Sequence, residues 1–191
     1  NLDGGGSTAI SGVYPGMDNS VILNSPSDGR LRACSNYIFL RNATEPSEIP
    51  DKLFLYPFGQ HYLSGYSEKL TTTAVDTNFY KIPTPEKLMF EVTGESTVKD
   101  NILTAIGDGK QTISVTDGKI SGSLDFYVYE SPTEIIVNNT KTGKEVKEIQ
   151  AKTNDIFNFD FIAKYNNIEL KSDKDSFVVE IDEEIGEVTP D

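Results

Sequence analysis

The sequence contains one cysteine, one histidine and no tryptophan, and these scarcities limit its chemistry. Cys34 has no partner for an internal disulfide, and His61 alone cannot supply a histidine-based metal site. No run approaches 18 apolar residues, so we predict no membrane span within the chain. Catalysis would therefore depend on carboxylates, arginines, hydroxyls and backbone groups, and we expect neither a metal nor a cofactor.

Positive charge is also scarce. Seventeen Lys and Arg stand against thirty Asp and Glu, which gives a formal net charge of −13. A chain of this charge repels phosphate backbones and anionic membranes, so nucleic acid is an unexpected partner. The sequence opens without Met or a signal-peptide pattern and stops in a turn-like run, so we expect it to be a fragment of a longer protein.

Helical periodicity is rare, whereas short alternating or β-branched runs recur between Gly, Pro, Asn and Asp clusters. Such runs, about ten residues apart, are typical of a β-sandwich. The sequence therefore predicts a mainly β protein. Its expected strands are residues 52–56, 88–92, 112–115, 124–129, 134–137 and 177–181.

Two prolines within residues 44–50 mark a first boundary, and a proline after the strand that ends at Tyr129 marks a second. Across the second boundary the chain repeats weakly at an offset of 89, which aligns Ala74 with Ala163. The first copy continues through three further strands that the second copy lacks. We therefore predict a complete module at 48–130 and a truncated copy at 131–191.

The first segment that suggests chemistry is Leu2-Asp3-Gly4-Gly5-Gly6-Ser7-Thr8. Three successive glycines allow consecutive N–H groups to converge on an anion, and Ser, Thr and Asp side chains add hydroxyls and a carboxylate. Taken alone, the run is better explained as a glycine-rich turn or an engineered linker.

The second segment is Asn24-Ser25-Pro26-Ser27-Asp28-Gly29-Arg30-Leu31-Arg32, followed by an apolar run at 37–40. Residues 26–29 have the composition of a turn that leads into a strand. Arg32 has the planar fork that pairs with a phosphate in bidentate fashion. Taken alone, this segment reads as a hairpin with an exposed arginine.

Together, in this order and spacing, the two segments resemble the carboxy-terminal signature of the phosphodiester glycosidase family. That family includes the enzyme that uncovers mannose 6-phosphate by removing N-acetylglucosamine from a phosphodiester. Many similar bacterial members are secreted and carry β-domains after the catalytic domain. The resemblance covers residues 1 to about 42, and it implies that residues 1–44 are the last strands of an α/β catalytic domain followed by immunoglobulin-like domains.

The resemblance also implies roles for individual residues. Leu31 departs from the family pattern, which usually has Glu before this arginine, so the local ion pairing is in doubt. The implied catalytic residues are Asp3, Ser7 and Arg32, and the implied substrate-binding residues are Gly4, Gly5, Gly6, Thr8, Asn24 and Asp28.

The parent protein is thus expected to be a secreted or cell-surface bacterial hydrolase that acts on a sugar-1-phosphodiester, with a glycan or cell-wall polymer as partner. The chain alone is expected to be inactive, because most of the catalytic domain lies upstream. The alternative is a non-catalytic immunoglobulin-like spacer or interaction protein. Aromatic residues around His61 raise a third interpretation, sugar binding, but core or edge positions explain them better in a chain without Trp.

Overall fold

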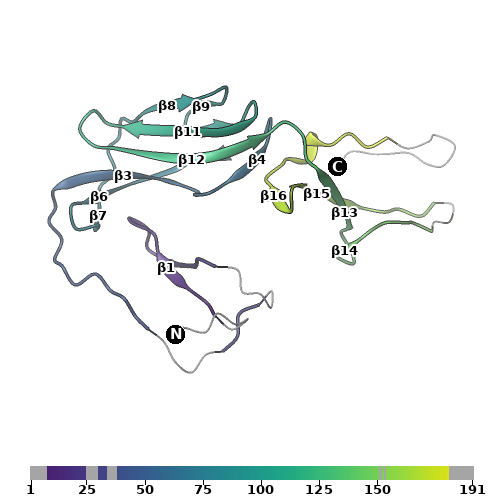
Figure 1. Ribbon diagram of the computed structural model, residues 1–191, viewed down its shortest axis with the longest axis horizontal. Coiled ribbons are helices and arrows are strands. Elements are labelled where there is room, and N and C mark those ends of the chain that lie inside the picture. The colour runs from purple at the N-terminus through teal and green to yellow at the C-terminus, as the bar shows by residue number, and fades with distance from the viewer. Residues whose placement is uncertain (1–7, 25–29, 34–37, 151, 153, 181–191) are drawn as a thin grey trace. The chain divides into compact units, whose positions relative to one another are not determined.

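The computed structural model describes residues 8–24, 30–33, 38–150, 152 and 154–180, and it confirms a mainly β fold (Figure 1). Regular structure in these residues consists of sixteen strands and one 3-10 helix, η1 (Lys174–Ser176). The strands are β1 (Ser11–Val13), β2 (Ser20–Ile22), β3 (Pro50–Tyr56), β4 (His61–Leu63), β5 (Ser67–Lys69), β6 (Thr71–Asp76), β7 (Lys81–Ile82), β8 (Met89–Thr93), β9 (Thr97–Lys99), β10 (Ile102–Thr104), β11 (Gly109–Thr116), β12 (Ser121–Tyr129), β13 (Glu134–Asn139), β14 (Lys144–Glu145), β15 (Phe159–Tyr165) and β16 (Ile168–Leu170).

These strands form four sheets. The largest has the order β7-β6-β3-β12-β11-β8, with β4 paired to β12 outside this path. A second sheet has the order β5-β10-β9, a third has the order β14-β13-β15-β16, and β1 pairs with β2 alone. The strands expected at 52–56, 88–92, 112–115, 124–129 and 134–137 are all present, with bounds shifted by a few residues.

The chain divides into two compact units. The first consists of the described residues up to Leu55, together with Thr72–Met89 and Val115–Ser123, and the second of Tyr56–Thr71, Phe90–Ser114 and the described residues from Leu124 onward. Strands β3, β11 and β12 each continue from one unit into the other. The predicted domain limits at 44, 48–130 and 131–191 stay predictions.

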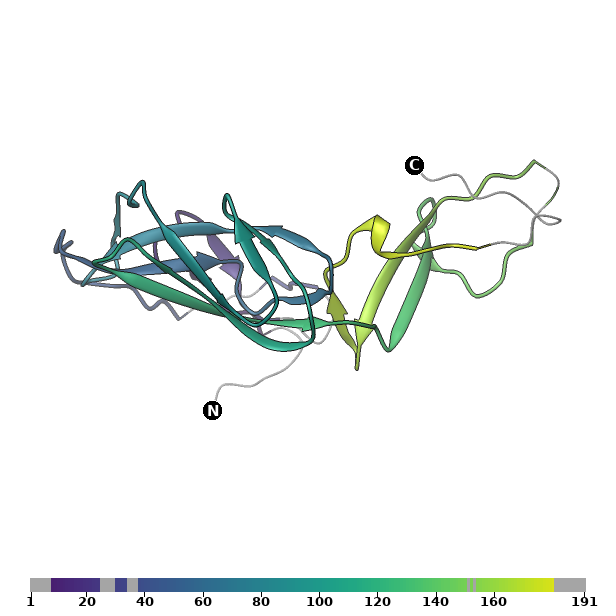
Figure 2. The same cartoon turned by 90° about the horizontal axis from the view of Figure 1, so that it is seen from above.

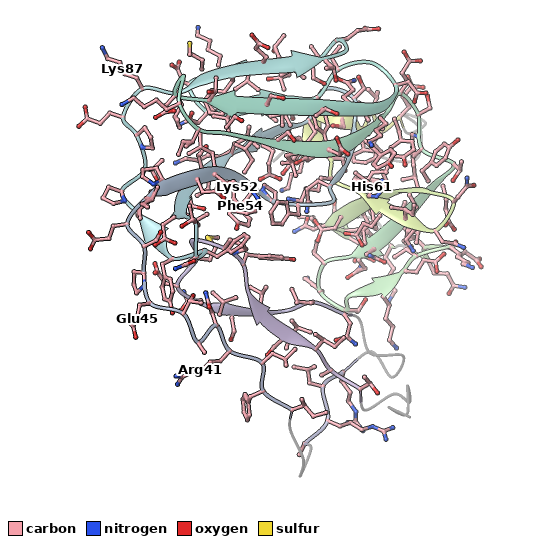
Figure 3. All side chains as sticks on the ribbon, turned by 60° about the vertical axis from the view of Figure 1, so that its left-hand side comes forward. Arg41, Glu45, Lys52, Phe54, His61 and Lys87 are labelled. Atoms are coloured by element: carbon pink, nitrogen blue, oxygen red, sulfur yellow. The ribbon has the colours of Figure 1, made fainter. Side chains whose placement is uncertain are left out.

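The core of the first unit comes from alternation along β3 and from continuous burial of residues 73–76 in β6. Leu53, Leu55 and Val75 are at most 2% exposed, whereas Lys52 points outward and its ammonium lies 5.6 Å from the centroid of the Phe79 ring (Figure 3). Strand β12 runs parallel to β3 here, and a Cβ added at Gly122 would overlap the Leu53 carbonyl oxygen. Glycine is therefore required for this close approach of two backbones.

The core of the second unit follows the same two-residue period along β11 and β12. Ile113, Phe126 and Val128 are at most 1% exposed. Strand β4 lies parallel to the end of β12, with His61 opposite Tyr127. This arrangement buries Tyr62 against the edge of the Phe126 ring, with the ring centroids 5.9 Å apart.

The four-stranded sheet is built on the antiparallel pair β13 and β15 (Figure 2). A two-residue turn, Asn166 and Asn167, connects β15 to β16. Both residues have positive φ, which a two-residue hairpin turn requires to match the right-handed twist of its strands. The order β16-β15-β13 matches β7-β6-β3, and the aligned residues Ala163 and Ala74 are both fully buried. The structure thus repeats where the sequence does.

The repeat ends after β16. A strand was expected at 177–181, but Phe177–Glu180 form none, and Ile181 lies outside the described residues. Phe177 instead follows η1, and its ring stacks on Phe161 at a centroid distance of 5.4 Å. The run has an apolar strand composition, but residues 177–180 form no ladder with any described strand.

Strand β4 also contacts the end of β16 within the second unit. The Leu63 amide donates to the Lys171 carbonyl at 2.9 Å, and the Lys171 amide donates to the His61 carbonyl at 2.8 Å. Leu63 is buried together with Ala163 and Leu170 in one small apolar cluster. A residue of the first predicted module thus completes the core of the second.

The segment expected as a linker, 44–50, is held by the turn that follows β6. The Tyr80 hydroxyl donates to the Thr44 carbonyl at 2.6 Å, and the side-chain amide of Asn78 donates to the Glu45 carbonyl at 2.7 Å. Asp76 accepts from the backbone of Ser47 at 2.7 Å. The boundary expected at 44–50 stays a prediction, and in the structure this segment is bonded to the turn after β6 within the first unit.

Candidate functional site

Thr8 and Asn24, which belong to the two segments that carry the family resemblance, lie at the open end of one hairpin. Strands β1 and β2 are antiparallel, with Ser11 opposite Ile22 and Val13 opposite Ser20. The ladder extends one step further, because the Leu23 amide donates to the Ile10 carbonyl at 2.8 Å. Ile10 and Leu23 therefore close the described part of the hairpin at its open end.

Asn24 joins these two ends with both halves of its amide. Its Oδ1 accepts from the Ile10 amide at 2.7 Å, and its Nδ2 donates to the Thr8 carbonyl at 2.9 Å. Among small side chains, only an amide offers a donor and an acceptor in this geometry. The residue that opens the second segment thus fixes the backbone where the first segment ends.

The structure places three of the predicted site residues. Thr8 and Asn24 are half-buried and bonded to one another, and Arg32 is exposed. The other predicted site residues lie outside the described residues: Asp3, Gly4, Gly5, Gly6, Ser7 and Asp28. All the proposed site roles therefore stay predictions, although Asn24 has a positioning role that the sequence did not reveal.

Charge is distributed unevenly around this site. Residues 1–44 contain three aspartates and three arginines and no Lys or Glu, so their formal charge is zero. The whole net charge of −13 therefore lies in residues 45–191. An anionic ligand is repelled less by the predicted site than by the rest of the chain.

The tip of the same hairpin contacts strand β6, which the sequence interpretation missed. Residues 14–17 form a turn in which Gly16 has φ +76° and the Met17 amide donates to the Tyr14 carbonyl at 2.9 Å. The Thr73 hydroxyl donates to the Pro15 carbonyl at 3.2 Å. The Pro-Gly pair was the available signal, since Pro at the second and Gly at the third position define a type II turn.

His61 lies in an aromatic group on the second unit (Figure 3). Its ring stacks on Tyr127 at 5.0 Å and on Tyr129 at 5.8 Å, and its Nδ1 is 3.1 Å from the Tyr129 hydroxyl. Tyr129 also packs against Tyr165 at 4.4 Å. The rings of this group therefore contact one another.

No helix of the described residues is long and apolar enough to cross a membrane. The same residues contain no group of three or more His, Cys, Asp or Glu side chains arranged to hold a metal ion. No protein-family model matches the sequence, and comparison with curated proteins also finds no match.

Proposed function

We propose that this chain supplies the carboxy-terminal strands and the appended β-modules of a phosphodiester glycosidase that hydrolyses a sugar-1-phosphodiester of the N-acetylglucosamine type. The observation that carries the proposal is the Asn24 bridge to Thr8 and Ile10. It ties together the two segments on which the family resemblance rests, although they are separated by sixteen residues. A spacer protein has no need to fasten a glycine-rich segment to a Pro-Ser-Asp-Gly segment.

In this proposal the residues before and after the hairpin share the chemistry. The glycine N–H groups at 4–6 bind the phosphate, and Arg32 adds a bidentate charge. Asp3 acts in proton transfer or orients a sugar hydroxyl, and the hydroxyls of Ser7 and Thr8 donate hydrogen bonds to the substrate. Asn24 keeps these two groups at a fixed separation, which is how preorganised donors stabilise a transition state.

Two further observations support the proposal. Residues 1–44 carry no net charge in an otherwise acidic chain, so they repel a phosphodiester less than the rest of the chain does. The apolar run at 37–40 was expected to be a strand, but its described residues 38–40 form none, and Ile38 and Leu40 are 77% and 97% exposed. Large apolar side chains this exposed are typical of a surface that another part of a protein covers, here the proposed upstream catalytic domain.

The test uses this chain extended by its upstream sequence and measures hydrolysis of an N-acetylglucosamine-1-phosphodiester. We expect turnover by the extended protein and none by residues 1–191. Asn24→Ala should lower kcat/KM about a hundredfold, because catalytic groups misplaced by about an ångström lose this much. Asn24→Asp keeps the acceptor for Ile10 but cannot donate to Thr8, so its loss should be smaller.

Asn19→Ala is the matched control, since Asn19 is an exposed asparagine near the other end of the same hairpin. It should leave turnover unchanged. An extended protein that folds and binds no sugar phosphodiester would contradict the proposal. Equal activity of Asn24→Ala and the unaltered protein would remove the bridge from the mechanism.

The second candidate is a spacer or interaction role for the β-modules at a bacterial cell surface. The hydrogen bonds that fasten 44–50 to the turn after β6 favour it, because a spacer must keep its connections ordered. The two roles are separable. Deleting 45–191 from the extended protein should preserve hydrolysis of a small soluble diester if these residues serve only as a spacer.

A further inference from the structure

A pocket lies in the second unit where strand β16 separates from β15. The two strands pair from Ala163–Leu170 to Tyr165–Ile168, but the next residue, Lys171, forms a bridge with Tyr62 instead. The separation leaves a pocket of about 220 Å³ between the start of β15 and residues 170–172. Its walls therefore come from segments that backbone pairing already holds in place.

Two aromatic rings line this pocket, and each is supported by a second ring. Tyr66 stacks on the buried Tyr62 at a centroid distance of 5.6 Å and an interplanar angle of 16°. Phe161 stacks on Phe177 at 5.4 Å and 25°. Rings fixed in this way lose little conformational entropy when a ligand packs on them.

The polar part of the wall has both donors and acceptors. Glu169, Lys171 and Ser172 line the pocket, and the Lys171 ammonium is paired with the Glu68 carboxylate. Burial raises the pKa of the Tyr66 hydroxyl, and Glu68 raises it further, so this hydroxyl stays a hydrogen-bond donor. Because the Lys171 ammonium is paired with Glu68, no cation in the pocket wall balances the charge of Glu169. The Glu169 carboxylate is therefore the acceptor of the pocket.

We propose that this pocket binds one neutral sugar ring. A pyranose has an apolar face that packs on an aromatic ring, and hydroxyls that both donate and accept hydrogen bonds, so it matches a wall of this mixed composition. An anion is disfavoured by Glu169 and by the charge of −13. A purely apolar ligand would leave these polar groups without partners.

This site is separate from the hairpin site and does not rest on the proposed hydrolysis. Its lining residues all follow position 65, whereas the residues proposed for hydrolysis all precede position 33. Sugar binding is tested on residues 1–191, whereas hydrolysis is tested on the extended protein. Either proposal can therefore fail while the other holds.

The probes are N-acetylglucosamine, glucose, galactose and mannose, with choline and inorganic phosphate as the competing ligand classes. Two-dimensional NMR of the labelled chain follows the backbone amides during each titration. We expect saturable shifts at Tyr66, Phe161, Lys171 and Ser172 with at least one sugar in the millimolar range. Absence of saturation with all four sugars, or stronger shifts of these amides with choline or phosphate, would overturn the proposal.

Matched variants separate binding from folding. Glu169→Gln should raise the dissociation constant for the sugar about tenfold, the usual loss of a charged hydrogen bond, whereas Glu145→Gln on β14 should not change it. Phe161→Leu keeps apolar volume but removes the ring face, and its control, Phe159→Leu, removes another stacked, half-buried ring on β15. Equal effects within either pair, in folded proteins, would also count against the site.

Discussion

The carboxylate of Asp76 accepts a hydrogen bond from the backbone amide of Ser47 at 2.7 Å, across 29 residues of sequence. The same oxygen accepts from the Glu48 amide at 3.0 Å, and the other oxygen accepts from Asn78 and Tyr80, each at 2.9 Å. Burial raises the pKa of Asp76, but these four bonds outweigh it and hold the pKa below its ordinary value of 3.8. The Asp76 side chain therefore closes the turn at residues 76–80 and also holds the segment 47–48 that leads into β3.

Asp76→Asn should destabilise the protein, because the amide nitrogen that replaces one oxygen cannot accept from two N–H groups. The urea midpoint of unfolding should fall clearly. Asp51→Asn is the control, since Asp51 is a partly exposed strand aspartate that makes only a 3.8 Å ion pair, with its neighbour Lys52. Similar midpoints for the two variants would show that the four bonds contribute little.

The lowered pKa also predicts how stability depends on pH. A carboxylate whose pKa is lower in the folded than in the unfolded state stabilises the fold fully above its unfolded pKa. This contribution is lost as pH falls from about 3.8 through the lower folded value. The difference in unfolding free energy between the natural chain and Asp76→Asn should be constant from pH 7 to 5 and shrink towards pH 3. A difference that grows in acid would contradict the assignment.

Gly122→Ala should be among the most damaging single changes in the first unit. Its new Cβ would overlap the Leu53 carbonyl, and backbone cannot move aside without separating β12 from β3. We expect a loss of more than about 3 kcal/mol, measured by chemical unfolding. Gly118→Ala is the comparison, because Gly118 has φ +90° with open space around it, so its cost should be only the strain of about 1–2 kcal/mol.

Leu63→Ala should loosen the second unit where β4 contacts β16. The side chain is 6% exposed and packs with Ala163 and Leu170, so its removal should cost about 2–5 kcal/mol. Hydrogen exchange should then speed up across residues 159–171. Leu103→Ala removes another buried leucine, on β10, and should destabilise without this local signature. Uniform exchange in both variants would argue against the shared cluster.

The sequence predicted the long strands well because burial of one face imposes a strict two-residue period, as β11 and β12 show. It was wrong at 177–180, where the apolar composition is present but the residues pair with no described strand. It also read 44–50 as a simple connection. The bonds to Asp76 depend on contacts between residues about thirty positions apart, which local composition does not encode.

For the site, the sequence singled out Asn24 and Thr8 but did not indicate that they bond to one another. A spacing of sixteen residues gives no indication that an amide will bridge Thr8 and Ile10, because that depends on the register of β1 and β2. The pocket beside Tyr66 was equally hidden. It exists because Lys171, which follows β16, forms a bridge with Tyr62 of β4 and does not continue the pairing with β15. Its lining combines residues about a hundred positions apart.

The contact of Leu63 with Ala163 and Leu170 bears on how such a chain can be rearranged during evolution or by engineering. An independently folding module can be moved, duplicated or exchanged because all residues of its hydrophobic core lie within the module. Here, cutting after Tyr129 would strip Leu63 of its apolar neighbours and expose the backbone groups that bond to Lys171. We therefore expect residues 131–180 to be moved between proteins, in evolution or by engineering, only together with β4.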